Sequence, residues 1–384
     1  MNRTRSDVIV VGGGAIGCAV AWRLAQRGSS VTVVERGVPG TAATAAAAGM
    51  LSPLGELRHA PPLEALGVAS LAMWPSFAGE LHERTGIEIE LRVAGTLHVS
   101  LGDADDAALD GVLEAAQGRG VEAMTGDAAR ACEPALSPAV RRAVLVTGDM
   151  RVDNRRLGHA LWHAAQQDGV VFRTGVRVRR VVHDYAKARI RGVRLDDGTE
   201  LLAATTVIAA GAWSAGIEGI PAQRPVFPVR GEMFAVGPTS SAASGGVSGP
   251  QHAPPLVTRM IHGPRGYLIP RDNGNVLVGA TVEEAGFEPG PTPVGIAMMI
   301  AMASEVAPGI ARLPILETWS GFRPATPDRL PLLGGDPALD GLVWATGHYR
   351  NGILLTPITG ARIAALVAGE RAEDLAAFAP GRFG

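Results

Sequence analysis

The chain has 384 residues, of which 47% are hydrophobic and 19% are charged, and its net charge is −2. This length is sufficient for two domains with sizeable cores, and the near-neutral charge does not favour binding to nucleic acid or to an anionic membrane. No run of about 18 strongly apolar residues is present for a transmembrane segment, so we expect a cytoplasmic protein that binds small metabolites.

The first predicted elements are a buried strand, a glycine-rich turn and a helix. Val8 to Val11 form a β-branched run typical of a parallel sheet. Gly12 permits the tight turn, Gly14 lets a pyrophosphate approach the backbone, and Gly17 allows the helix to pack closely on the strand. The unpaired N–H groups and the helix dipole would bind the pyrophosphate. The pattern therefore predicts a dinucleotide site, with a tight packing corner as the alternative.

A second predicted strand ends at Glu35, which lies 35 − 17 = 18 residues after Gly17. A carboxylate at this position would accept hydrogen bonds from ribose hydroxyls and would disfavour a 2′-phosphate. The motif alone does not distinguish NAD from FAD. The following segment, Gly40 to Leu51, consists largely of small residues, which suits contact with a large flat ring; its alternative is an ordinary alanine-rich helix.

The central region is predicted to alternate between strands and helices. Strands are expected within 86–101, a helix over Asn154–Asp168, and a strand pair within 170–184. Asp197-Gly198 indicates a hairpin turn. The apolar strand Thr206–Ala210, which ends at Gly211, is expected to return to the first sheet.

Residues 221–314 have the character of an inserted mixed or antiparallel module. Short strands flank an Asn273-Gly274 turn signal, and a helix rich in Met and Ala follows. The stretch 238–256 is polar and broken by Gly and Pro, which predicts a long loop. The chain then continues through 341–370 as a strand, a glycine turn and a long helix.

Two cysteines and nine histidines do not form a recognisable metal or disulfide pattern. Cys18 is expected to be a small packing residue of the first helix, and Cys132 has no partner spacing. His159 and His163 share a helix face without a metalloprotease glutamate, so we interpret them as helix surface.

Four segments together resemble the D-amino-acid oxidase family of flavoenzymes, and most closely its bacterial glycine oxidase branch of the thiamine pathway. They are 10–36, 45–53, 318–335 and 345–360. The resemblance implies an α/β, two-domain FAD-dependent oxidoreductase fold, with a Rossmann-type dinucleotide-binding domain and a mixed or antiparallel substrate domain. It implies an FAD domain made of 1–85, 151–220 and 315–384, and a substrate domain made of 86–150 and 221–314.

The resemblance also implies that FAD binds without a covalent link, because both cysteines lie in the N-terminal half and related flavin linkages use a C-terminal cysteine. Together, the fingerprint and the resemblance assign to the cofactor Gly12, Gly14, Ala15, Ile16, Gly17, Glu35, Arg36, Ala43, Thr44, Ala48, Gly49, Met50, Val176, Gly211, His348, Tyr349, Arg350, Asn351, Gly352, Ile353 and Leu354. The backbone N–H groups of Arg350 to Ile353 are predicted to lie at a helix start, where they would meet negative charge on the reduced flavin.

Arg323 matches the family's arginine that binds the substrate carboxylate, and Tyr267 matches the tyrosine that donates to the same group. A planar, permanently charged guanidinium suits bidentate recognition of a carboxylate. The alternatives are a solvated arginine and a core tyrosine, with Arg230 or Arg265 as the anchor. Trp319 and Trp344 are interpreted as packing residues.

The implied activity is oxidative deamination of glycine or another small amine, such as sarcosine or D-alanine, with oxygen as acceptor and hydrogen peroxide as product. The imine would hydrolyse to a 2-oxo acid and ammonia, or pass to thiazole assembly. Three alternatives stay open: a D-amino-acid dehydrogenase that reduces a quinone or carrier, an oxidase of a bulkier secondary amine such as proline, and a flavin-binding assembly or sensor protein. The sequence leaves open whether the chain forms a homo-oligomer.

Overall fold

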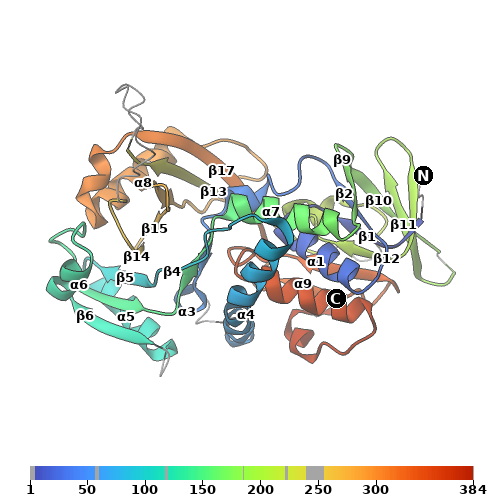
Figure 1. Ribbon diagram of the computed structural model, residues 1–384, viewed down its shortest axis with the longest axis horizontal. Coiled ribbons are helices and arrows are strands. Elements are labelled where there is room, and N and C mark those ends of the chain that lie inside the picture. Colours follow the sequence, from blue (N-terminus) through green and yellow to red (C-terminus); the bar gives the residue numbers. More distant parts are fainter. Residues whose placement is uncertain are drawn as a thin grey trace.

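Two eight-stranded sheets, each with its own helices, organise the chain in a computed structural model. The structure describes residues 5–56, 60–116, 120–184, 186–220, 224–238 and 255–383. Figure 1 shows the two sheets side by side, with both chain ends beside the first sheet.

The first sheet has a parallel centre built from β-branched strands. Its order is β10-β11-β12-β1-β2-β9, and β19 pairs with both β12 and β18. Its strands are β1 (Arg5–Val11), β2 (Val31–Glu35), β9 (Val171–Thr174), β10 (Val178–Asp184), β11 (Arg189–Leu195), β12 (Glu200–Ile208), β18 (Leu332–Gly335) and β19 (Leu342–Thr346). Strand β1 is parallel to both β2 and β12, so the turn after β1 lies at the carboxyl edge where α/β sheets bind ligands.

Four helices share an apolar core with this sheet: α1 (Ala15–Gln26), α4 (Pro61–Thr85), α7 (Asn154–Gln167) and α9 (Thr356–Val367). Trp22, Trp74 and Phe77 are almost fully buried where α1 meets α4. In both views α1, α7 and α9 are neighbours, with α4 beside them. Burial of these large rings fixes the direction in which α1 leaves the glycine turn.

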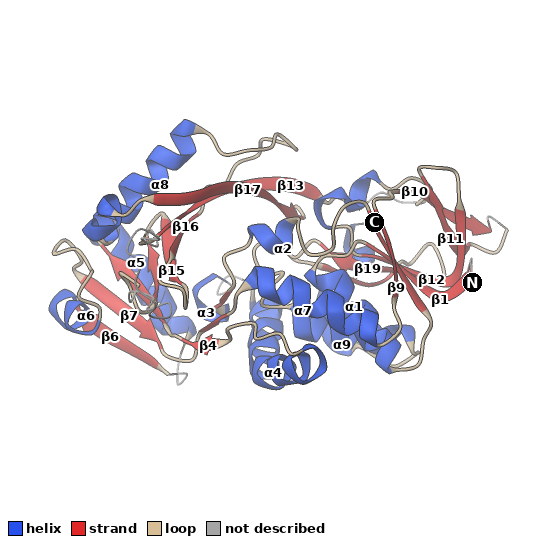
Figure 2. Ribbon diagram, turned by 45° about the horizontal axis from the view of Figure 1, so that its top comes forward, coloured by secondary structure: helices blue, strands red, loops and turns tan. Residues whose placement is uncertain are grey.

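The second sheet is mixed, with order β17-β13-β16-β15-β14-β5-β7-β6. Its strands are β5 (Thr96–Ser100), β6 (Val121–Thr125), β7 (Arg142–Val146), β13 (Phe227–Val236), β14 (Met260–Gly263), β15 (Gly266–Pro270), β16 (Val276–Gly279) and β17 (Ile315–Ala325). Helices α8 (Pro293–Val306) and α6 (Gly126–Cys132) contribute to one apolar cluster on it, and α5 (Asp103–Ala115) to another. The long strands β13 and β17 arch toward the first sheet above α2 (Ala43–Ala46), as Figure 2 shows.

The remaining elements are short. A three-stranded sheet pairs β3 (Met50–Leu51), β8 (Met150–Arg151) and β4 (Arg92–Val93), and α3 (Pro53–Glu56) follows β3. In the part of the chain that the structure describes, the 3-10 helices are η1 (Gly211–Gly216), η2 (Pro308–Arg312), η3 (Glu373–Phe378) and η4 (Pro380–Phe383). Within the described ranges, no helix is both long enough and apolar enough to cross a bilayer.

Several sequence predictions are confirmed. Strand β12 returns beside β1, and antiparallel pairs flank both Asp197-Gly198 and Asn273-Gly274. The predicted strand pair within 170–184 is wrong as a pair: β9 joins β2 at one edge of the sheet, whereas β10 joins β11 at the opposite edge. Because β9 pairs in parallel with β2, Phe172 is partly buried against the apolar core of the first sheet. The alternation of polar and apolar residues within 170–184 does not reveal this long-range pairing.

The division into two domains stays a prediction, but its boundary at residue 315 can be compared with the sheets of the structure. The strand that begins at Ile315, β17, pairs with β13 along its whole length and therefore belongs to the second sheet. The predicted long loop 238–256 falls mostly outside the described residues.

Candidate cofactor and substrate site

Two cavities meet at the carboxyl edge of β1. The larger has a volume of about 370 Å³ and extends between the two sheets, and the smaller, of about 110 Å³, lies beside the end of β2. Residues of the glycine turn, of α2 and of the β12 end line both of them: Gly14, Ala43, Thr44, Ala209 and Gly211. This shared wall makes the two cavities halves of one elongated site.

Most residues that the sequence analysis singled out line this site. In the larger cavity they are Gly14, Ala15, Ile16, Ala43, Thr44, Ala48, Gly49, Met50, Gly211, Tyr267, Arg323, His348, Tyr349, Arg350, Asn351, Gly352, Ile353 and Leu354. Gly12, Glu35 and Arg36 line the smaller one. Gly17 and Val176 line neither cavity; the Val176 N–H donates at 3.3 Å to the carbonyl of Glu35, which lines the smaller cavity.

In the glycine turn, backbone carbonyl groups lie so close to two glycines that a side chain would not fit there. Gly12 has a φ of +107°, and a Cβ there would overlap the Ala209 carbonyl, while a Cβ on Gly17 would overlap the Gly12 carbonyl. Helix α1 starts after Gly14 without a side-chain cap. Gly14, Ala15 and Ile16 line the larger cavity, so the positive dipole end of α1 faces the site, although the Ala15 N–H itself donates to the Thr44 hydroxyl.

Glu35 ends β2 beside the smaller cavity. Its Oε2 accepts the Gly13 N–H at 2.7 Å and its Oε1 accepts the Gly37 N–H at 2.8 Å. The carboxylate thus stabilises the glycine turn itself, and each of its oxygens can accept a further hydrogen bond from a ribose hydroxyl. Next to it, the Arg36 guanidinium carbon lies 3.5 Å from the ring centroid of Trp213.

The alanine-rich segment is a single turn of helix followed by extended chain, and hydrogen bonds from α1 and α7 hold it in place. The Thr44 Oγ1 accepts the Ala15 N–H at 2.9 Å. Asn154 donates to the carbonyls of Thr44 and Ala45 at 2.8 and 3.0 Å. The small side chains of this segment line the larger cavity, and their contact with a flat ring stays a prediction.

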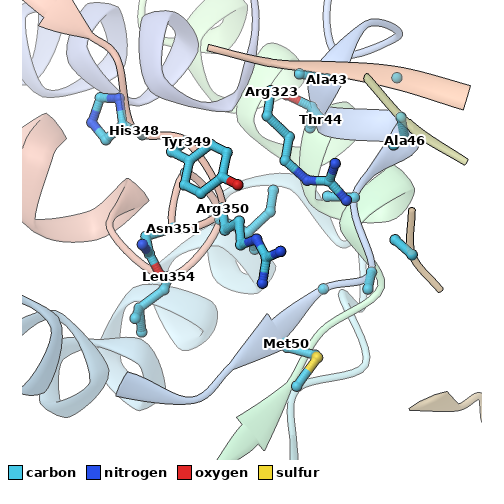
Figure 3. Close-up of a pocket in the computed structure, with 18 of the residues that line it drawn as sticks. Ala43, Thr44, Ala46, Met50, Arg323, His348, Tyr349, Arg350, Asn351 and Leu354 are labelled. Atoms are coloured by element: carbon cyan, nitrogen blue, oxygen red, sulfur yellow. The ribbon is translucent and has the colours of Figure 1, made fainter. Parts of the chain in front are cut away.

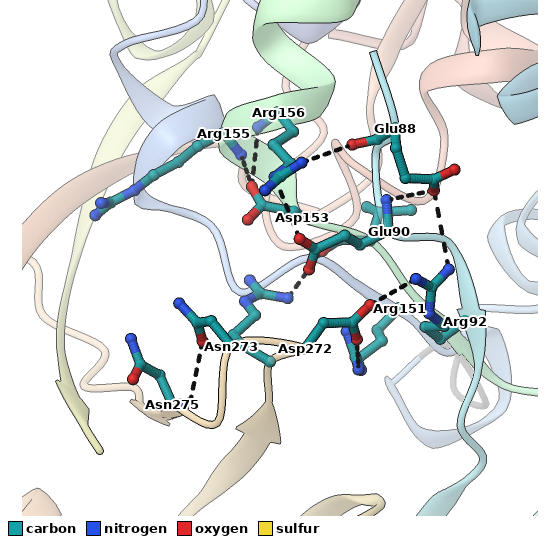
Figure 4. Close-up of polar contacts among 12 residues, drawn as sticks. Glu88, Glu90, Arg92, Arg151, Asp153, Arg155, Arg156, Asp272, Asn273 and Asn275 are labelled. Atoms are coloured by element: carbon teal, nitrogen blue, oxygen red, sulfur yellow. Dashed lines mark hydrogen bonds and ion pairs between the residues drawn. The ribbon is translucent and has the colours of Figure 1, made fainter. Parts of the chain in front are cut away.

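Arg271, in the turn after β15, also helps to hold the alanine-rich segment in place. Its guanidinium donates to Ala48 O, Val152 O and Asn154 Oδ1, each at 2.9 Å. Burial lowers its pKa to about 10, so it is still charged at neutral pH. Figure 4 shows the neighbouring polar contacts, in which Arg151 pairs with Asp272 at 2.6 Å and Asp153 caps α7.

Arg323 projects from β17 into the larger cavity, and Figure 3 shows its guanidinium directed toward the same space as that of Arg350. Its Nη1 donates to the carbonyls of Arg230 and Thr281 at 3.1 and 3.0 Å, which fixes the plane of the group. Within the described chain, its Nε and Nη2 hydrogens make no hydrogen bond. They are suitably placed to bind a carboxylate.

The other proposed anchors are less suitable. Arg230 does not line the cavity, because its guanidinium forms ion pairs with Glu283 and Glu232. Arg265 lines the rim, is 62% exposed and pairs with Glu305. Tyr267 lines the cavity, and its hydroxyl lies 3.7 Å from the Met233 sulfur.

The turn 348–354 closes the opposite side of the larger cavity. Helix α9 begins at Thr356, so the prediction that Arg350 to Ile353 lie at a helix start is wrong by about one turn. An i to i+4 bond from Leu355 N–H to Asn351 O forms a separate turn first. Even so, no hydrogen bond within the described residues uses the N–H of Gly352 or Ile353.

Buried groups behind this turn keep it rigid. His348 contacts Thr359 at 3.1 Å, and burial lowers its pKa to about 3, so the ring is neutral at physiological pH. Ser70 and Trp74 donate to the Leu354 carbonyl at 2.7 and 3.0 Å. The buried α4 thereby fixes the end of the turn.

These features fit FAD. The positive end of the α1 dipole suits a pyrophosphate, and Glu35 and Arg36 border a space for the adenosine half. The N–H groups of Gly352 and Ile353 suit the electron-rich edge of a flavin. Neither cysteine lines either of these two cavities: Cys18 is buried within α1 and Cys132 lies on α6. Non-covalent binding of FAD stays a prediction.

His98, His262, Met233 and Gly231 are among the residues that line the larger cavity but were not predicted from the sequence. Alternation along β5 could have placed His98 on the face opposite Leu97 and Val99, but the pairing of β5 with β14 joins distant segments. Trp319 and Trp344 pack as expected; Trp344 is fully buried and donates to Asp336 at 2.9 Å.

Comparisons with known proteins agree with this geometry. Residues 7–366 match the family described as FAD dependent oxidoreductase (DAO). The chain is 35% identical to the glycine oxidase of Geobacillus kaustophilus, covering 97% of this chain and 96% of that protein. It superimposes on the crystal structure of glycine oxidase from the same organism with a TM-score of 0.89, at 33% identity and 98% coverage of both chains.

The chain is also 36% identical, over 99% of its length, to the bifunctional protein ThiO/ThiG of Synechocystis sp. (strain ATCC 27184 / PCC 6803 / Kazusa). It spans about half of that relative, at 54% of the relative's length.

Proposed function

Because the chain belongs to the DAO family of FAD dependent oxidoreductases, we propose that it is an FAD-dependent oxidase of small amino acids, with glycine as the first candidate substrate and oxygen as electron acceptor. Its glycine oxidase relatives, matched over nearly their whole length, support this choice. The product would be an imine, which water converts to glyoxylate and ammonia.

The observation that carries the proposal is the position of Arg323. Its free N–H groups face a cavity whose other wall is the turn 348–354, so a carboxylate held by Arg323 places the rest of a small amino acid between the two. When bound there, FAD supplies the oxidising power, taking two electrons and a hydrogen from the substrate carbon and delivering them to oxygen.

The protein's own contribution is to position the substrate and exclude water. Arg323 fixes the carboxylate, and Tyr267 lines the same wall. Among the described residues that line the larger cavity there is no Asp or Glu to act as a general base. None is required, because the hydrogen leaves the α carbon together with its electron pair and the amine only has to bind in its neutral form.

The test is an aerobic assay of the yellow protein with glycine, sarcosine, D-alanine and D-proline, with detection of hydrogen peroxide. Peroxide formed with glycine or sarcosine supports the proposal. Substrate-dependent reduction of a quinone without peroxide would indicate a dehydrogenase, and preference for D-proline an oxidase of bulkier amines. A protein that binds FAD but turns over no amine would be a flavin-binding protein without this activity.

A further inference from the structure

The segment after β16 continues the second sheet irregularly beside the larger cavity. Regular pairing of β13 with β16 ends at the pair of Met233 and Gly279. An isolated antiparallel bridge follows between Arg230 and Glu283. The two pairs are three residues apart on β13 (233 − 230) but four apart on the other segment (283 − 279). Segment 280–282 therefore contains one extra residue and forms a β-bulge, a feature that redirects chain groups next to functional sites.

The bulge presents a carbonyl group to the substrate anchor. The Arg323 Nη1 donates to Thr281 O at 3.0 Å and to Arg230 O at 3.1 Å. The Arg230 carbonyl is fixed by the bridge itself, because it also accepts the Glu283 N–H at 3.0 Å. The Thr281 carbonyl lies within the bulge, where the regular pairing of the strands does not fix its direction. Its direction therefore depends on the interactions that hold the bulge.

The side chains of Thr281 and Glu283 hold the bulge from behind the cavity wall. Ala280 and Val282 line the larger cavity, but the residue that follows each of them does not. The Thr281 hydroxyl accepts the Glu232 N–H at 2.9 Å and donates to the Glu283 carboxylate. The Thr281 side chain thus links β13 to the end of the bulge.

Glu283 takes part in this group as a charged residue. Its other carboxylate oxygen accepts a hydrogen bond from the buried guanidinium of Arg230. Burial alone would raise the pKa of Glu283. Hydrogen bonds from Thr281 and Arg230 outweigh this effect, with a contribution from the charge of Arg323, and hold the pKa below its usual range. The carboxylate is therefore ionised at neutral pH, which strengthens both of the hydrogen bonds that it accepts.

We propose that Thr281 and Glu283 are positioning residues for the substrate carboxylate. Their side chains fix the bulge, the bulge directs the Thr281 carbonyl, and this carbonyl orients the Arg323 guanidinium in the cavity. This inference rests on the proposed function and extends its carboxylate site to two residues that act only through Arg323. Loss of either side chain should therefore weaken carboxylate binding more than it slows the chemical step.

Thr281→Val removes the hydroxyl at nearly constant volume, whereas Thr281→Ser keeps it. Flavin reduction without oxygen, measured over a range of glycine concentrations, gives the Kd for glycine and the limiting rate separately. We expect Thr281→Val to raise this Kd about 3- to 10-fold, the effect of one hydrogen bond, with a much smaller change in the limiting rate. Thr281→Ser should restore the Kd of the wild type, and Thr318→Val, at an exposed site on β17, should not alter it.

Glu283→Gln tests the second residue. Glutamine offers one acceptor oxygen instead of two, so either Thr281 or Arg230 loses its partner, and we expect a similar rise in the Kd for glycine. Acetate has the carboxylate but no amine to oxidise, and its Kd can be measured from the change in the flavin absorption spectrum. This Kd should rise by the same factor in each variant. Flavin content and circular dichroism identify a variant that fails to fold, and the other variant then decides.

A residue that acts only through Arg323 has no effect once the Arg323 side chain is removed. In the Arg323→Ala background, Thr281→Val should therefore leave the second-order rate constant of flavin reduction by glycine unchanged. An equal loss in both backgrounds would show a general structural role of Thr281 and would overturn the inference.

The outcomes separate this inference from the proposed function. Suppose that glycine reduces the flavin and that Arg323→Ala weakens its binding, but that folded Thr281→Val and Glu283→Gln bind glycine and acetate as the wild type does. The inference alone is then overturned. If no amine reduces the flavin of the wild type, the proposed function and the inference are both overturned.

Discussion

Gly231 of β13 lies against the guanidinium of Arg323, so closely that a Cβ atom at residue 231 would overlap Nη1, Nη2 and Cζ. The absence of a side chain at Gly231 therefore gives Arg323 the space in which its Nη1 reaches the carbonyls of Arg230 and Thr281. The carboxylate anchor thus consists of an arginine and a glycine from two paired strands.

Gly231→Ala should displace Arg323 and raise the KM for glycine, by about tenfold or more if one charge-assisted hydrogen bond is lost. Because FAD contacts are predicted elsewhere, flavin content should change little. Steady-state kinetics checks this, with Gly79→Ala as control, since a Cβ on that exposed helical glycine meets no atom within 4 Å. An unchanged KM in the Gly231 variant would argue against the anchor.

Glu35→Ala should weaken FAD binding. The substitution leaves the N–H groups of Gly13 and Gly37 without their carboxylate acceptor and removes the predicted ribose contact. We expect the Kd for FAD to rise about 10- to 100-fold, the effect of losing one or two hydrogen bonds to a charged group. Titration of the apoprotein with FAD, followed by flavin fluorescence, measures this; Glu122→Ala, an exposed site on β6, should leave the Kd unchanged.

Arg271→Met should destabilise the fold and loosen the cavity wall. The buried guanidinium satisfies three acceptors around the alanine-rich segment, and methionine satisfies none. We expect a loss of roughly 2 to 5 kcal/mol in the free energy of unfolding, together with weaker FAD binding. Chemical denaturation monitored by circular dichroism compares it with Arg191→Met on the exposed side of β11. Equal stability of the two variants would remove the supporting role of Arg271.

Asp149 should make stability depend on pH in a defined direction. Burial raises its pKa to about 6 from the usual value of 3.8, so the folded state binds the proton more tightly than the unfolded state. The stability that Asp149 contributes is present below pH 4 and is lost as the pH rises through 6, by an amount on the order of 3 kcal/mol.

Asp149→Asn keeps a polar partner for Ser52 but cannot ionise. The free energy of unfolding of the wild type, measured relative to this variant, should therefore fall between about pH 4 and pH 6 and then level off. Denaturation series at several pH values give this difference directly. A constant difference across that range would contradict the raised pKa.

The parts of the site that depend on local sequence could be predicted. The β1 turn, Glu35 at the end of β2 and the glycine-containing turn 348–354 each follow from a few neighbouring residues, and the structure brings them to one edge of the first sheet. The start of α9 was misplaced because the residues before Thr356 form a turn of their own, closed by Asn351 and Leu355, which has no distinct sequence signal.

The parts that depend on strand pairing could not be predicted. His98 and His262 are 164 residues apart, and only the parallel pairing of β5 with β14 brings them together. The same holds for Gly231 and Arg323, and for the contact of Arg271 with Ala48. In each case segments far apart in the sequence meet through strand pairing or a long-range side-chain contact, which the periodicity of either segment does not reveal.

The most direct test of the central claim is the rate at which glycine bleaches the flavin in the absence of oxygen, compared between the wild type and Arg323→Ala. We predict a loss of at least about 100-fold in the second-order rate constant of the variant, because a bidentate charged contact is removed. Arg312→Ala, at an exposed site, should match the wild type. If Arg323→Ala retains full FAD and bleaches as fast as the wild type, the account of the substrate site is wrong.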